Sequence, residues 1–150
     1  MQAKVTTRAA QASDEAAFYR FICALEEREL ERAAFSRSYA LNYGNSGNIY
    51  LISELGEEPV GILTCHVQHL LHHEGPVYEI QELYVGEPYR SQGVGRLLLE
   101  ELLTRLSGSG IDTLEVSSNV RRTGAHRFYL REGFVGSHLK FTRSFKPVDH

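Results

Sequence analysis

A short segment with two closely spaced glycines and flanking arginines carries the clearest chemical signal in the sequence. The segment reads Leu83-Tyr84-Val85-Gly86-Glu87-Pro88-Tyr89-Arg90-Ser91-Gln92-Gly93-Val94-Gly95-Arg96. Gly93 and Gly95 let the backbone turn tightly and bring several N–H groups together, where the following helix also presents its positive dipole end. Arg90 and Arg96 can add charge at the rim. This combination is typical of a pyrophosphate site, although many strand–helix turns need glycine for steric reasons alone.

The same segment excludes two common nucleotide-binding motifs. It lacks the third glycine of the dinucleotide-binding pattern GxGxxG, and no Walker lysine follows it. A nicotinamide-dependent enzyme and a P-loop ATPase are therefore disfavoured.

Two glutamates, Glu79 and Glu82, lie on an otherwise apolar strand predicted over 77–85. A charge buried in a central strand is costly, so each carboxylate needs compensation or a function. On a regular strand their odd spacing places them on opposite faces, and only one can point at a substrate. A bulge would change that parity. Either side chain can serve as a general base, and the structural alternative is a carboxylate that is solvated or paired with arginine.

Four histidines lie within eight residues just before this strand: His66, His69, His72 and His73. Neutral imidazoles can ligate a divalent metal, and protonated ones can bind an anionic substrate group. The group can also be the solvated end of a hairpin. Its spacing is not that of the helical zinc motif HExxH. The sequence leaves these three interpretations open.

The pattern of apolar residues predicts the elements that position these side chains. Strands are expected at 4–10, 49–55, 60–70, 77–85, 112–117 and 134–145, and helices at 13–29, 33–43, 94–106 and 123–131. Ser13 is the expected N-cap of the first helix. This order predicts an α/β (α+β) fold, in which a mixed sheet has helices packed on its faces.

Length and composition narrow the function further. The chain has 150 residues and a formal charge of −3, which favours one domain over 1–150 and excludes a general nucleic-acid binder. No apolar run approaches the ~20 residues that span a bilayer, and the N-terminus lacks the apolar core of a signal peptide. Cys23 and Cys65 are expected to be reduced core residues. We therefore expect a soluble, cytoplasmic protein without a membrane partner.

The glycine segment also carries a family resemblance. Arg90-Ser91-Gln92-Gly93-Val94-Gly95 resembles the R/Q-x-x-G-x-G/A acyl-CoA signature of the GCN5-related N-acetyltransferase (GNAT) superfamily. A second signature is matched at similar spacing by Asn119, Ala125, Phe128, Tyr129, Gly133 and Phe134. The resemblance covers essentially the whole chain. It implies the GNAT fold, with a central mixed, mostly antiparallel sheet and helices on both faces, and acetyl-CoA as cosubstrate.

A narrower resemblance is to the aminoalkylphosphonate N-acetyltransferases. It rests on His66-Val67-Gln68, Leu71-His72-His73, Glu79-Ile80-Gln81-Glu82-Leu83, Asn119-Val120 and residues 125–133. This likeness implies transfer of acetyl to a small amine that bears a phosphonate, and a divalent metal with His66, His72 and His73 as candidate ligands. It also implies that Glu82, His66 and His72 contact the acceptor. Arginines that could hold the phosphonate are Arg37, Arg121, Arg127 and Arg131, which the sequence does not rank.

The superfamily resemblance implies which residues bind acetyl-CoA. They are Leu83, Tyr84, Val85, Arg90, Ser91, Gln92, Gly93, Val94, Gly95, Arg96, Asn119 and Tyr129. The strand before the glycine turn is expected to splay from its neighbour and pair with the pantetheine, with the Leu83 N–H on the thioester carbonyl. Tyr129 matches the position whose phenol faces the CoA sulfur. A phenol of pKa ~10 can protonate a departing thiolate of pKa ~8.5.

For the base, Glu79 lies eleven positions before Arg90, which matches the catalytic glutamate of histone-type members. We expect Glu79 to take the amine proton, with Glu82 as the alternative. The resulting hypothesis is an N-acetyltransferase that acts on an aminoalkylphosphonate. The alternatives are the same chemistry on a polyamine, an aminoglycoside or a protein terminus, and a non-catalytic acyl-CoA sensor. Superfamily members often pair, so a homodimer is also expected.

Overall fold

The computed structural model describes residues 4–146, which fall into two compact units, the first ending at Val116 and the second beginning at Ser117. The single domain expected over 1–150 stays a prediction. In chain order the elements are β1 (Val5–Ala9), η1 (Ala12–Asp14), α1 (Glu15–Glu26), α2 (Arg32–Tyr43), β2 (Ile49–Leu55), β3 (Glu58–Gln68), β4 (Val77–Val85), η2 (Glu87–Tyr89), α3 (Val94–Leu106), β5 (Thr113–Val116) and α4 (Thr123–Arg131).

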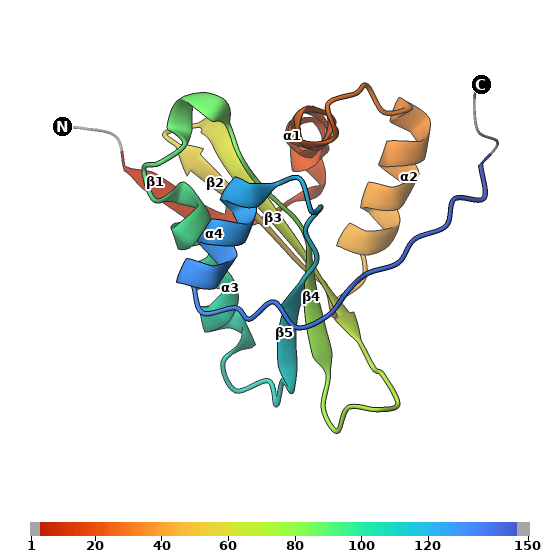
Figure 1. Ribbon diagram of the computed structural model, residues 1–150. Coiled ribbons are helices and arrows are strands. Elements are labelled where there is room, and N and C mark those ends of the chain that lie inside the picture. The colour runs from red at the N-terminus through yellow and green to blue at the C-terminus, as the bar shows by residue number, and fades with distance from the viewer. Residues whose placement is uncertain (1–3, 147–150) are drawn as a thin grey trace. The chain divides into compact units, whose positions relative to one another are not determined.

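The first unit is built on a mixed sheet whose strands lie in the order β1-β2-β3-β4-β5 within the described residues (Figure 1). The pairs β1–β2, β2–β3 and β3–β4 are antiparallel, and β5 lies parallel to β4. The expected mixed, mostly antiparallel sheet is therefore confirmed. None of the helices within residues 4–146 is long and apolar enough to cross a membrane.

Helices cover both faces of this sheet, α1 on one face and α3 on the other (Figure 1). Ile62 of β3 is buried in a cluster with Phe18 of α1. The neighbouring Gly61 points to the other face, where a Cβ would lie 3.1 Å from Val94 and 3.2 Å from Leu98 of α3. Only glycine allows the backbone of β3 and the start of α3 to approach this closely.

A β-bulge interrupts the pairing of β3 with β4. Thr64 pairs with Glu82, but Cys65 pairs with Ile80, so Gln81 is an extra residue on β4. Glu79 and Glu82 are three positions apart and would point to opposite faces of a regular strand, but the extra residue of the bulge turns them to the same face. Both glutamates consequently lie on the same face of the sheet.

Two expectations about local structure are wrong. Ser13 lies inside the short turn η1 rather than capping α1, because the Asp14 carboxylate accepts the Gln11 N–H (2.7 Å) and so begins that turn earlier. The strand expected at 134–145 is absent, since residues 132–146 hold no helix or strand. Phe134 is half-buried against Tyr129, but the later apolar side chains Val135, Leu139, Phe141 and Phe145 are exposed. Alternating apolar residues form a strand only when a partner strand satisfies their backbone groups.

Candidate active site

The glycine segment forms the tight turn that the sequence predicts. Ser91 and Gly93 have left-handed backbone conformations, with φ of +62° and +82°, and α3 begins directly afterwards. No side chain caps this helix, so the N–H groups of its first turn are available to an anionic ligand. The Arg90 Nε donates to the Val85 carbonyl (3.0 Å), which ties the turn to the end of β4.

The backbone groups of β4 point alternately to β3 and away from it. The Glu82 N–H donates to Thr64 Oγ1 (3.0 Å), and the Gly86 N–H donates to a carbonyl of β3 (2.8 Å). Because successive residues of a strand point to opposite edges, the N–H groups of Leu83 and Val85 point away from β3.

The edge to which these N–H groups point is only partly covered. β5 pairs with β4 along Val77–Ile80 and ends at Val116. Within the first unit, the remainder of β4 up to Val85 therefore has no strand partner on this side. A ligand with amide groups can pair with the exposed edge as an added strand would.

On the face of the sheet covered by α1 and α2 lies a pocket of about 100 Å³. Its lining comes from both helices and from β2, β3 and β4, and consists of Phe18, Ile22, Phe35, Ser38, Tyr39, Asn42, Tyr50, Thr64, His66 and Glu82. Drug-sized ligands occupy roughly 300–1,000 Å³, so this pocket suits the narrow end of a small molecule. Its lining holds one carboxylate and no lysine or arginine.

Glu82 supplies that carboxylate. Its Oε2 accepts a hydrogen bond from the Thr64 hydroxyl (3.0 Å). Burial raises the pKa of the Glu82 carboxyl above its usual range, the Thr64 hydrogen bond opposes this, and the charge of Glu26 adds to it. A carboxylate whose pKa is shifted toward neutrality is suited to taking a proton from an amine.

Glu79, the base expected from the sequence, lies one step along the same face. It is opposite His66 in the register of β3 and β4, and its Oε1 accepts a hydrogen bond from Gln81 Nε2 (2.9 Å). Glu79 is not among the residues that line the pocket. The bulge thus puts both glutamates on the same face, and Glu82 is the one that lines the pocket. The role of Glu79 stays a prediction.

Tyr50 and His66 form a hydrogen-bonded pair in the pocket wall. The Tyr50 Oη lies 2.9 Å from His66 Nε2, and the two rings are parallel. Burial lowers the pKa of His66, although the charge of Glu79 opposes this. Sequence reasoning missed Tyr50. Tyr50 and Ile52 are two positions apart on β2, which indicates that both side chains point to the same face of the sheet. That Tyr50 lies at the pocket follows only from its pairing with Thr64 of β3.

The other histidines do not join His66. His72 and His73 lie in the β3–β4 loop with ring centroids 4.5 Å apart, and the His73 Nδ1 hydrogen-bonds the Asp112 carboxylate. Across residues 4–146, no three His, Cys, Asp or Glu side chains are grouped so that they could hold a metal ion. The candidate set His66, His72 and His73 therefore does not fit a shared metal site.

The second unit contains the two remaining predicted residues. The Asn119 carbonyl accepts a hydrogen bond from His126 Nε2 (2.8 Å), which links the segment before α4 to the helix. Tyr129 lies on α4, with its ring edge-on to Phe128 and Phe134 at centroid distances of 5.4 and 5.6 Å. Burial raises the pKa of the Tyr129 phenol, so its hydroxyl is protonated at neutral pH.

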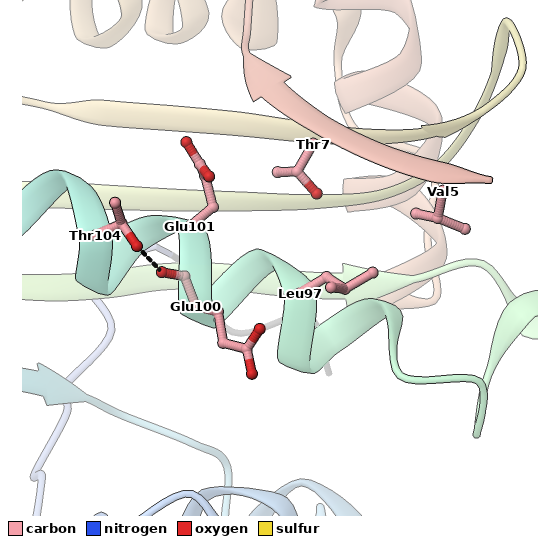
Figure 2. Close-up of a pocket in the computed structure, with 6 residues that line it drawn as sticks. All are labelled: Val5, Thr7, Leu97, Glu100, Glu101 and Thr104. Carbon is pink, nitrogen blue, oxygen red and sulfur yellow. Dashed lines mark hydrogen bonds between the residues drawn. The ribbon is translucent and has the colours of Figure 1, made fainter.

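A larger groove of about 280 Å³ lies between β1 and α3 and is shown in Figure 2. Its acidic side chains are Glu100 and Glu101 of α3. Each is paired along the helix, Glu100 with Arg96 (3.3 Å) and Glu101 with Arg105 (2.9 Å). Both carboxylates of the groove therefore have an arginine partner on α3.

Comparison with known proteins assigns this architecture to a family. The model of the acetyltransferase (GNAT) family matches residues 12–134 of the chain. The chain belongs to this family. The protein is accordingly an N-acetyltransferase that uses acetyl-CoA, as the glycine turn and the second signature predicted.

One relative in sequence supports this assignment, and solved structures share the fold. The chain is 38% identical to an aminoalkylphosphonate N-acetyltransferase of Salmonella typhimurium over 137 residues, which cover 91% of this chain and 89% of the relative. In fold it resembles a transcriptional regulator from Bacillus halodurans, with a TM-score of 0.86 at 22% identity over 95% of this chain and all of the other. An aminoglycoside N-acetyltransferase in complex with CoA gives a TM-score of 0.84 at 12% identity, covering 97% of this chain and 98% of the other.

Proposed function

We propose that this acetyltransferase acetylates the primary amine of a small aminoalkylphosphonate, and that the amine binds in the pocket beside Glu82. The observation that carries the proposal is the single carboxylate in a narrow, otherwise uncharged pocket. A carboxylate attracts an ammonium group and can also take its proton. The extensive likeness to an aminoalkylphosphonate N-acetyltransferase supports this acceptor.

Acetyl-CoA binds along the exposed edge of β4 in this proposal. Its pantetheine pairs with the backbone of Val85, and its pyrophosphate binds the N–H groups of the glycine turn, with the contacting residues Arg90, Ser91, Gln92, Gly93, Val94, Gly95 and Arg96. The orientation of the Leu83 and Val85 N–H groups away from β3 supports this placement. Asn119 and the backbone of Tyr84 complete the expected contacts.

The reaction then runs by direct attack. Glu82 removes a proton from the ammonium group, and the free nitrogen attacks the thioester carbon. The Leu83 N–H donates to the developing oxyanion, as backbone donors do in other acyl transfers. When the C–S bond breaks, Tyr129 donates its phenolic proton to the departing thiolate. Glu79 is the alternative base.

The phosphonate is held outside the narrow part of the pocket in this proposal. The lining contains no cationic side chain, and a phosphonate dianion needs strong donors. Arg37 is exposed on α2 next to the lining residue Ser38, so it is the first-unit candidate for this contact. The amine therefore enters first and the anionic end stays at the mouth.

We further propose that the enzyme acts in the cytoplasm as a homodimer. Free Cys23 and Cys65 suit a reducing compartment. The exposed apolar residues of 132–146, such as Leu139 and Phe141, are the expected contact with a second copy. Sedimentation of the wild type and of a Leu139→Ser, Phe141→Ser variant tests the dimer, because the variant should be monomeric.

A thiol-release assay over a panel of amines tests the function directly. The panel contains 2-aminoethylphosphonate, its sulfonate analogue, a polyamine and an aminoglycoside, each with and without a chelator. We expect the highest kcat/KM with the aminoalkylphosphonate. A higher kcat/KM with the polyamine or aminoglycoside contradicts the acceptor, and a loss of activity with chelator shows a metal requirement that the described histidines do not explain. Absence of heat on titration with acetyl-CoA contradicts the cosubstrate site.

A further inference from the structure

The pocket contains a tyrosine whose position is fixed from several sides. Tyr50 lies among three other rings: it stacks on Phe18 (centroids 5.8 Å apart), meets Tyr39 edge-on (5.9 Å) and is parallel to His66 (5.7 Å). Its hydroxyl is held 2.9 Å from His66 Nε2. A side chain packed in this way is already in one conformation before a ligand arrives, so binding to it costs little conformational entropy.

Three other polar side chains of the pocket already donate to groups of the protein. The Tyr39 hydroxyl donates to the Gln11 carbonyl (2.7 Å), and the Thr64 hydroxyl donates to Glu82 (3.0 Å). The Asn42 amide donates to the Ser38 carbonyl (2.9 Å). When the Tyr50 hydroxyl donates to a neutral His66 imidazole, its oxygen keeps both lone pairs available to an N–H donor of a ligand.

We propose that Tyr50, positioned by His66, accepts a hydrogen bond from the acceptor amine and restricts the enzyme to primary amines on a narrow chain. The inference rests on the proposed function, in which the amine enters this pocket. An alkylammonium has three N–H donors. One proton passes to Glu82 as the nitrogen is deprotonated, one N–H remains bonded to Tyr50, and the nitrogen lone pair is then directed at the thioester.

The size of the pocket explains why substitution on nitrogen is disfavoured. At about 100 Å³, with aromatic rings on its walls, it has little room for an additional methyl group beside the amine. An N-methylated amine must also place that methyl group where one of the N–H donors would be. His66 acts here as a positioning residue, since its contact is with Tyr50.

The test compares Tyr50→Phe, His66→Phe and His66→Gln with the wild type, using 2-aminoethylphosphonate and its N-methyl derivative as acceptors. We expect Tyr50→Phe to raise the KM for the primary amine about ten-fold, the usual effect of losing one hydrogen bond to a charged group, with the KM for acetyl-CoA unchanged. The preference for the primary over the N-methylated amine should fall by a similar factor. Tyr43→Phe, which removes an exposed tyrosine hydroxyl from α2, is the matched control and should match the wild type.

A comparison of His66→Gln with His66→Phe tells whether His66 positions Tyr50 by a hydrogen bond or only packs against it. The carboxamide of His66→Gln can still accept the Tyr50 hydroxyl, so this variant should recover most of the amine affinity that His66→Phe loses. Equal KM values in the two His66 variants, or a Tyr50→Phe enzyme with wild-type amine selectivity, overturn the inference. If the wild type acetylates no primary amine, the proposed function itself fails. Unfolding midpoints are measured for every variant. If His66→Phe does not fold, the amine KM and amine selectivity of Tyr50→Phe alone test the inference.

Discussion

The two faces of the central sheet are built from alternate residues of the same strands, yet they differ in chemistry. On the α3 face, Leu51 and Leu63 are fully buried, as are Leu98 and Leu102 of α3. On the α1 face, apolar packing gives way near the middle of β3 to a pocket with a carboxylate. The α1 face thus combines an apolar cluster around Phe18 and Ile62 with polar groups that are suited to function.

The bulge in β4 creates this difference. If β4 were regular, with Gln81 paired instead of bulged, Glu79 and Glu82 would lie on opposite faces, and one carboxylate would be directed into the apolar α3 layer. Burial of an uncompensated charge there costs several kcal/mol. The bulge thus keeps both carboxylates out of the apolar α3 layer.

The largest expected effect separates the two glutamates on the polar face. Glu82→Gln should lower kcat about 100-fold or more, because the general base is lost, while Glu79→Gln should change kcat by less than about three-fold. Steady-state kinetics at saturating acetyl-CoA measures both. The reverse order would restore Glu79 as the base, and two near-normal variants would contradict base catalysis from β4.

On the apolar face we expect the opposite pattern. Leu63→Ala leaves a cavity beneath α3 and should lower the free energy of unfolding by about 2–5 kcal/mol. The KM for the amine, measured at a temperature where the variant is folded, should be unchanged. Leu103→Ala, at a residue of α3 that is half exposed, is the control and should cost much less. A change in amine KM for Leu63→Ala would show that the faces are not independent.

The stability of the polar face should depend on pH. Because the pKa of Glu82 is raised by burial, the folded protein binds more protons than the unfolded chain between the two pKa values, and stability falls as pH rises through that interval. Glu82→Gln does not titrate. We expect its unfolding midpoint to equal that of the wild type below the unfolded pKa of about 4.5 and to exceed it increasingly toward neutral pH. A constant difference would contradict the raised pKa.

The smallest effect concerns the hydroxyl that contacts Glu82. Thr64 donates to this carboxylate and thereby lowers its pKa. Thr64→Val should therefore raise that pKa and move the acidic limb of the kcat profile to higher pH. Activity should fall several-fold near pH 6 and much less near pH 8. A uniform loss across the pH range would indicate altered packing instead.

Local sequence patterns predicted most of the first unit. β2 and β4 have the expected bounds, because their apolar runs end at clear turn residues. The position of the glycine turn was also predictable, since Gly93 adopts the left-handed conformation that favours glycine. The presence of the bulge was not, because register depends on how two strands pair over a distance in the chain.

The dependence of strand register on long-range pairing also explains which features of the candidate site the sequence did not predict. Tyr50 belongs to the pocket only through its pairing with Thr64, and the bulge at Gln81 puts both glutamates on the pocket's face of the sheet, where Glu82 lines it. The segment 134–145 has strand-like alternation, but a strand also needs a partner, which alternation alone does not supply. Long-range pairing therefore accounts for most of the differences.

Within the first unit, β4 has no strand partner beyond Ile80 on the β5 side, which has a consequence for solubility in the absence of cosubstrate. An unpaired strand edge is a template on which another polypeptide can add. If acetyl-CoA occupies that edge, it also shields the protein from aggregation while it serves as the acetyl donor. Cells depleted of the thioester would then lose this enzyme to aggregation as well as lose its reaction.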